Sequence, residues 1–173
     1  MSSEKPREYF FKKNWVQNII WAIALLAIFL LLRPFMQGDV AQGQAPDFNA
    51  KTITGESINL ADLKGEPVLI HFWATWCPIC EIELDGIESV SKSYKTIKIA
   101  TSSGTNEELL TYAKKNNMLP NTIINDIDGE LMKRYGAKAV PASFIIDKDG
   151  TIKFIEVGFT TSYGLKARLW SLN

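Results

Sequence analysis

Two residues, Cys77 and Cys80, stand out as able to do chemistry, and they are the only cysteines among 173 residues. They are separated by Pro78 and Ile79 and follow directly after the apolar run 68–73. A strand that leads into a helix at a Cys-x-x-Cys pair is typical of a dithiol redox centre. Because both cysteines lie in one short motif, they cannot cross-link distant parts of a fold. We therefore interpret them as reactive rather than structural.

Cys77 is expected to be the exposed, attacking thiol. The thiolate is the reactive species, and a cysteine with an ordinary pKa of about 8.5 is mostly protonated at neutral pH. If a helix begins at this motif, free N–H groups and the positive end of the helix dipole favour the Cys77 thiolate and lower its pKa. Cys80 is expected to be more buried and to resolve the mixed disulfide that Cys77 forms.

Cys-x-x-Cys is also the spacing of half a structural zinc site. Zinc prefers four protein ligands in such sites. The chain offers no second cysteine pair and has a single histidine, His71. We therefore predict a redox pair and no metal.

The elements around this motif alternate between strand and helix patterns. The continuous apolar run 68–73 suits a central strand covered on both faces. The next helix should run from the cysteine motif to about Tyr94, with Ile82, Ile87 and Val90 in its buried stripe. Further strands are predicted at 48–53, 57–60, 97–101, 122–124, 143–146 and 152–157, and further helices at 106–116, 129–135 and 163–172. This order predicts an α/β fold with a mixed sheet.

The overall charge argues against a nucleic-acid-binding protein. Nineteen basic residues balance nineteen acidic ones, so the formal net charge is zero. No basic field is available to attract phosphates. A hydrophobic content of 46% is enough for a real core.

The first 45 residues differ from the rest. Residues 15–32 are apolar apart from Gln17 and Asn18, and eighteen helical residues span about 27 Å, close to the thickness of a bilayer core of about 30 Å. Basic residues gather before this run, which places the N-terminus in the cytoplasm. We predict a cytoplasmic tail at 1–14, a single transmembrane anchor at 15–33, a linker at 34–45 and an extracytoplasmic domain at 46–173. The protein would then lie in the inner (cytoplasmic) membrane with its domain in the periplasm or outside the cell.

Two other interpretations fit the apolar run less well. A cleaved signal peptide usually has an apolar region of about 7–15 residues, which is shorter than this one. A buried core helix would need an amphipathic pattern, which the run lacks. The anchor is preferred, and a signal peptide would deliver the same domain outside the cytoplasm.

Four segments of the chain resemble a known family: 45–48, 63–68, 72–80 and 139–147. They are similar to those of membrane-anchored thioredoxin-like thiol–disulfide oxidoreductases, which include the cytochrome c maturation reductases. The chain also resembles the thioredoxin-like member of bacterial copper-sensitivity suppressor clusters, because His71 directly precedes the cysteine motif. The resemblance implies a thioredoxin fold with an N-terminal β-hairpin extension and no cofactor. It implies protein disulfide or dithiol substrates, and a transmembrane thiol–disulfide electron donor or acceptor as partner.

The resemblance also implies roles for residues outside the cysteine pair. Pro141 would have a cis peptide bond, leaving the backbone of Val140 free to pair with an extended substrate; without the resemblance, an ordinary trans proline at a strand start would be preferred. Thioredoxins carry a buried Asp where this chain has His71. That histidine either accepts the proton of Cys80 or is a hydrogen-bonded core residue, and the sequence does not choose between them.

Glu83 and Trp76 complete the candidate site. Glu83 lies three residues after Cys80, as in the cytochrome-maturation reductases, where an acid near the cysteines would raise their pKa. A solvated helix carboxylate is the slightly preferred interpretation of Glu83. Trp76 is expected to form an exposed apolar lip for substrate, whereas Trp73 is expected to be core.

Three other functions fit the sequence less well. A peroxiredoxin would need Thr or Ser three residues before its cysteine, but Thr75 lies two before Cys77. A copper carrier would use soft thiolates, but Met ligands near the cysteines are absent. A disulfide-forming oxidase shares the same cysteine pair, and reduction of partners is preferred to it by family analogy alone.

Overall fold

The computed structural model describes residues 15–28, 31 and 40–173. Residues 15–28 are helical. Among the described residues, no helix combines the length and the apolar character needed to cross a membrane. The predicted tail 1–14 and residues 29, 30, 32 and 33 of the predicted anchor lie outside the described residues.

Residues 40–173 are built around a six-stranded sheet in the order β1-β8-β7-β4-β5-β6. Strands β4, β5 and β6 are parallel, whereas β7 is antiparallel to β4, and β8 to β7. A separate antiparallel hairpin is formed by β2 and β3. The strands are β1 (Gly43–Gln44), β2 (Asn49–Lys51), β3 (Ser57–Asn59), β4 (Val68–Trp73), β5 (Lys95–Thr101), β6 (Ile123–Asp126), β7 (Ala142–Ile146) and β8 (Thr151–Val157). The predicted mixed α/β fold and the N-terminal hairpin are confirmed.

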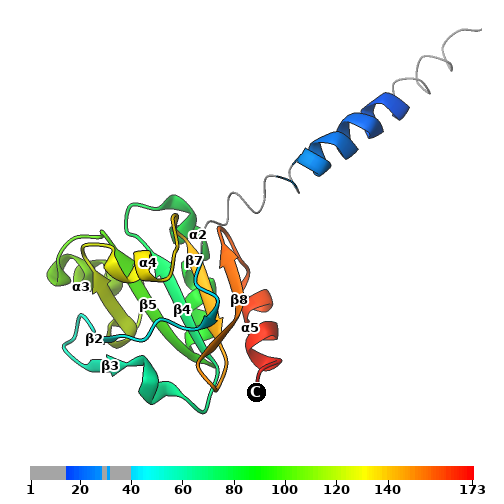
Figure 1. The fold of residues 1–173 in the computed structure, drawn as a ribbon. Helices are drawn as coiled ribbons and strands as arrows, with labels where there is room; N and C mark the ends of the chain where they lie inside the picture. Colours follow the sequence, from blue (N-terminus) through cyan, green and yellow to red (C-terminus); the bar gives the residue numbers. More distant parts are fainter. Residues whose placement is uncertain (1–14, 29–30, 32–39) are drawn as a thin grey trace, which may run out of the picture. The chain divides into compact units, whose positions relative to one another are not determined.

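Helices lie on both faces of this sheet (Figure 1). Helices α2 and α5 pack together over one face, and α4 lies on the other. The helices are α2 (Pro78–Ser91), α3 (Asn106–Lys115), α4 (Glu130–Arg134) and α5 (Ser162–Trp170), with short 3₁₀ helices η1 (Leu60–Leu63) and η2 (Pro120–Thr122).

The linker prediction is wrong at its C-terminal end. Gly43 and Gln44 form the edge strand β1, which pairs with Ile152 and Thr151 of β8. The backbone N–H of Ala41 also donates a hydrogen bond to the carbonyl of Tyr135. Backbone pairing to a sheet edge depends little on side chains, so the polar, glycine-containing sequence around β1 does not predict it.

Strand β4 is the centre of the fold, and all six of its residues are buried. Side chains alternate along a strand, so Val68, Ile70 and Phe72 enter one core while Leu69, His71 and Trp73 face α2. On the first face, the ring centroid of Phe72 lies 5.3 Å from that of Tyr135 and 5.7 Å from that of Phe144. On the second face, β4 carries a histidine directly beneath the helix that begins at the cysteine motif.

Helix α2 has a different buried face from the predicted one. Ile87 and Val90 are buried as expected, but Ile82 is 72% exposed and Glu83 takes the inward position. Residues 80, 83, 84, 87 and 90 recur at helical spacing, which makes them a continuous stripe. The helix also ends at Ser91 rather than near Tyr94.

Candidate active site

A disulfide joins Cys77 and Cys80 at the start of α2. Cys77 is the N-cap residue, with an extended backbone, and Pro78 occupies the first helical turn, where its missing N–H is not needed. The backbone N–H of Cys80 points at Sγ of Cys77 over 3.2 Å. When the disulfide is reduced, the same N–H group and the helix dipole would stabilise a thiolate on Cys77.

Both cysteines are buried, which corrects the expectation that Cys77 is exposed. Cys77 is 6% accessible to solvent and Cys80 is 3% accessible. The cause is the neighbouring loop: the carbonyl oxygen of Val140 lies 3.7 Å from Sγ of Cys77. A disulfide sulfur carries no proton, so this is a packing contact rather than a hydrogen bond.

The loop that covers the disulfide contains the peptide bond between Val140 and Pro141, which is cis as predicted. The carbonyl of Pro141 accepts a 2.8 Å hydrogen bond from the N–H of Gly158. Two residues further on, the N–H of Thr160 donates to Oε2 of Glu83 over 3.0 Å. The segment 158–160 therefore contacts both the proline loop and helix α2.

His71 lies beneath α2 and is 3% exposed. Its Nδ1 atom lies 2.9 Å from Oγ of Ser143 on β7, within hydrogen-bond distance. Burial, aided by the positive charge of Lys98, lowers the pKa of His71 to about 3. The imidazole is therefore neutral near pH 7. A cavity of about 10 Å³, close to the space of one water molecule, borders both His71 and Cys80.

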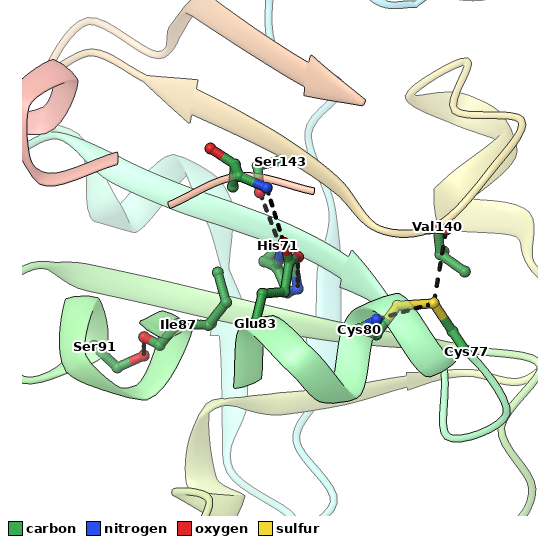
Figure 2. A network of polar contacts seen from close by, with 9 residues as sticks. His71, Cys77, Cys80, Glu83, Ile87, Ser91, Val140 and Ser143 are labelled. Carbon is green, nitrogen blue, oxygen red and sulfur yellow. Dashed lines mark hydrogen bonds and ion pairs between the residues drawn. A yellow bond between two sulfur atoms is a disulfide. The ribbon is translucent and has the colours of Figure 1, made fainter. Parts of the chain in front are cut away.

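Glu83 is 4% exposed, so the preferred interpretation of a solvated helix carboxylate is wrong. Its Oε1 atom lies 3.5 Å from Nε2 of His71 and has no hydrogen bond within the described residues. Burial raises the pKa of Glu83 to about 7, although the Thr160 N–H opposes this by stabilising the carboxylate. Because His71 is neutral at that pH, the contact is not a salt bridge. Figure 2 shows Glu83 and Ser143 meeting at His71 from α2 and β7.

A second buried pair lies beside this one, and no sequence motif predicted it. Lys98 on β5 is the register partner of His71 and forms an ion pair with Glu88 of α2. Burial lowers the pKa of Lys98, and Glu88 opposes this shift. Oε2 of Glu88 also accepts a hydrogen bond from the N–H of Leu119. Lys98 lies in the predicted strand 97–101, but nothing in the sequence indicates that its side chain is buried.

Apolar side chains are exposed next to the disulfide. Trp76 is 63% exposed, as predicted, and its indole N–H donates to the carbonyl of Ser102 over 3.0 Å. Ile79, between the two cysteines, is 46% exposed. Trp73 is buried against Tyr112, which confirms its assignment to the core.

The comparison with protein families settles the kind of protein. Residues 41–155 match the model of the AhpC/TSA family, and this range includes the cysteine pair and the cis proline. The chain belongs to the AhpC/TSA family. This AhpC/TSA protein is 35% identical over 131 residues to the thioredoxin-like protein YneN of Bacillus subtilis (strain 168), covering 73% of this chain and 76% of YneN.

Other relatives agree in fold and in named activity. The sporulation thiol-disulfide oxidoreductase A of Bacillus subtilis (strain 168) is 32% identical over 151 residues, which are 83% of this chain and 91% of the relative. The crystal structure of a secreted disulfide oxidoreductase of Mycobacterium tuberculosis, homologous to E. coli DsbE, is 29% identical, with a TM-score of 0.63 over 72% of this chain and 96% of that one. The AhpC/TSA protein is therefore a thioredoxin-like thiol–disulfide oxidoreductase.

Proposed function

We propose that Cys77 and Cys80 are the redox centre and exchange electrons with partner proteins from a membrane-anchored domain. The observation that carries the proposal is the disulfide at the N-terminus of α2, with Sγ of Cys77 against the Val140 carbonyl. This arrangement puts one sulfur where helix N–H groups stabilise a thiolate and beside a backbone segment with which a substrate can pair.

The exchange takes place in two steps when the protein acts as a reductant. The Cys77 thiolate attacks one sulfur of a partner disulfide, forming a mixed disulfide and releasing a partner thiolate. The Cys80 thiolate then attacks Sγ of Cys77, which re-forms the internal disulfide and releases the second partner thiolate. Two electrons pass to the partner, and the reverse sequence oxidises a partner dithiol.

Glu83 supports the second step as the proton acceptor for Cys80, and His71 positions it. The Cys80 thiol has to lose its proton before it attacks, and a base accepts that proton well only when its pKa lies near the working pH. The pKa of Glu83 is raised to about 7, whereas burial lowers that of His71 to about 3, so the imidazole is too weak a base. Glu83 lies one helical turn from Cys80 on α2, and its Oε1 atom lies 3.5 Å from Nε2 of His71.

Substrate binding is assigned to the Val140 backbone and the exposed face of Trp76. An extended substrate segment would pair with the backbone at Val140 and Pro141. An apolar residue near the partner's cysteine would pack on Trp76, which is 63% exposed beside the disulfide.

The reductase direction is preferred, as in the cytochrome c maturation branch that the sequence resembles. A reductase needs a transmembrane thiol–disulfide electron donor, whereas an oxidase needs an acceptor of that kind. The anchor at 15–33 and the linker after it would hold the domain on the extracytoplasmic face of the inner membrane, with the tail 1–14 in the cytoplasm. Helical residues 15–28 support the start of this anchor, and the similarity to a secreted disulfide oxidoreductase of Mycobacterium tuberculosis supports the location of the domain.

The copper-carrier alternative is not favoured. The sequence favours it through the soft thiolates of the cysteine pair and through the resemblance, carried by His71, to the copper-sensitivity branch. Both ring nitrogens of His71 face other groups, Nδ1 toward Ser143 and Nε2 toward Glu83. The imidazole therefore has no nitrogen directed at the cysteine sulfurs for a shared copper ion.

The proposed function is tested by equilibrating the full-length protein in glutathione buffers of graded redox poise and counting alkylated cysteines by mass. We expect one two-electron transition in which both thiols appear together. A pair that does not respond to thiol poise would overturn the proposal. Acid quench and alkylation in growing cells then gives the direction: two modified thiols indicate a reductant, and none indicates an oxidant.

A further inference from the structure

Ser143 makes a contact with His71 that no motif predicted. It lies on β7 directly opposite His71 in the antiparallel register with β4, and it is 2% exposed. Its hydroxyl lies 2.9 Å from Nδ1 of His71. A serine hydroxyl can donate one hydrogen bond and also accept, so it suits either protonation state of Nδ1.

Glu83 makes the complementary contact at the other side of the same ring. Oε1 lies 3.5 Å from Nε2, and Oε2 is held by the N–H of Thr160. A carboxylic acid at Glu83 would donate to Nε2, whereas a carboxylate would accept from an N–H at Nε2. Ser143 and Glu83 thus lie on either side of the buried His71 ring, the first within hydrogen-bond distance of Nδ1 and the second 3.5 Å from Nε2 (Figure 2).

We propose that Ser143 is a positioning residue that lets neutral His71 exchange tautomers as Glu83 gains or loses its proton. With Glu83 protonated, Glu83 donates to Nε2, and Nδ1–H donates to Ser143. With Glu83 ionised, Nε2–H donates to Glu83, and Ser143 donates to Nδ1. The first state holds three transferable protons, on Glu83, the ring and Ser143; the second holds two, and the third has passed to water or to a cysteine thiolate.

The ionisable groups around His71 favour this neutral exchange over an imidazolium. They are Glu83 and Glu88 on α2 and Lys98 on β5, whereas Cys80 on α2 also borders the ring but carries no charge in the disulfide. The cation of Lys98 opposes a positive charge on His71, and Glu88 is already paired with Lys98. Glu83 is the remaining carboxyl that contacts the ring, so its proton decides the tautomer.

This inference rests on the proposed function, because the proton in question is the one that the cysteine pair exchanges. Its test does not depend on activity. His71 is the only histidine of the chain, so protein labelled with ¹⁵N-histidine gives the NMR signals of one imidazole. The ¹⁵N shifts of Nδ1 and Nε2 distinguish the two tautomers and the imidazolium. The full-length chain, without a histidine tag, is measured in mild detergent from pH 5 to 9.

In the wild type, we expect the N–H to move from Nδ1 to Nε2 as the pH rises, with a midpoint near the pKa of Glu83, about 7. Ser143→Ala leaves a buried Nδ1–H without an acceptor, so the midpoint should fall by about one pH unit or more. Ser143→Thr retains the hydroxyl and should restore a midpoint close to the wild-type value. Glu83→Gln should abolish the transition.

An imidazolium near pH 7, a wild-type ring with one tautomer throughout, or an unchanged midpoint in Ser143→Ala would each overturn the proposal. Amide spectra of the same samples check that each variant is folded. If Ser143→Ala does not fold, Ser143→Thr and Glu83→Gln still test the switch, because the first should keep it and the second should lose it. Failure of the redox titration with an intact tautomer switch would instead count against the proposed function.

Discussion

Oε1 of Glu83 lies 3.5 Å from Nε2 of His71, and the two side chains are each less than 5% exposed. A buried carboxylate beside a neutral imidazole has lost its hydration without gaining an opposite charge. The pair therefore favours a proton on Glu83 up to about pH 7. Glu83 lies one helical turn from Cys80. It therefore titrates close to the cysteine pair, in the pH range where a thiol–disulfide oxidoreductase works.

The raised pKa of Glu83 predicts how stability changes with pH. The folded state binds this proton more tightly than the unfolded state, whose pKa is near 4.5. The stabilisation is complete below about pH 4.5 and is lost as the pH rises to about 7. Glu83→Gln removes this dependence, so its free energy of unfolding relative to wild type should rise by about 3 kcal/mol across that range. Urea unfolding at pH 4.5, 6 and 8 measures it, and a constant difference would contradict the raised pKa.

His71→Asn tests whether His71 positions Glu83 or only fills the core. The change keeps a polar group toward Ser143 but removes the ring that contacts Glu83, so the resolving attack of Cys80 should slow about tenfold or more. Single-turnover release of the second partner thiol gives this rate, and urea unfolding gives the stability. A loss of stability with an unchanged rate would assign His71 to the core alone.

The Lys98–Glu88 pair should couple strongly. Each single change, Lys98→Met or Glu88→Met, leaves a buried group without its partner and should cost about 3–5 kcal/mol of stability. The double variant has neither charge and should be more stable than the sum of the single changes predicts. Urea unfolding of the four proteins gives the coupling energy. Additive costs would show that the interaction between Lys98 and Glu88 does not stabilise the fold.

Trp76→Ala should weaken the binding of protein partners without affecting the chemistry. We expect the KM for a peptide disulfide to rise about tenfold, because exposed tryptophans often dominate binding energy. The rate with 2-hydroxyethyl disulfide should not change. Trp170→Ala is the matched control, since Trp170 is 72% exposed in the last turn of α5. Equal effects of the two variants would remove Trp76 from the binding surface.

The sequence predicted the elements of the fold well because their patterns are local. Strand β4 begins and ends at the predicted residues, since an apolar run after Pro67 and before the cysteine motif leaves little freedom. The buried face of α2 was harder to predict from the sequence. Ile82 looks like a core residue and Glu83 like a surface one, yet the rotation of α2 is set by Cys80 and Leu84, and Glu83 is held by Thr160, 77 residues away.

The site was predicted to a similar extent. The cysteine pair and the cis bond before Pro141 could be read from motifs, and the structure has both. The buried contacts of Ser143 and Lys98 could not be read from motifs, because they depend on the register of β7 and β5 against β4. The low exposure of Cys77 also follows from a contact distant in the sequence, with Val140.

The most direct test of the central claim is to trap the partner disulfide on Cys77. Cells expressing the full-length Cys80→Ser protein should accumulate mixed disulfides that dithiothreitol releases, because the resolving thiol is missing. Peptide mass mapping should place the partner on Cys77, and Cys77→Ser, the matched control, should trap far less. Equal trapping by the two variants, or none by Cys80→Ser, would contradict the assignment of Cys77 as the thiol that exchanges with partner proteins.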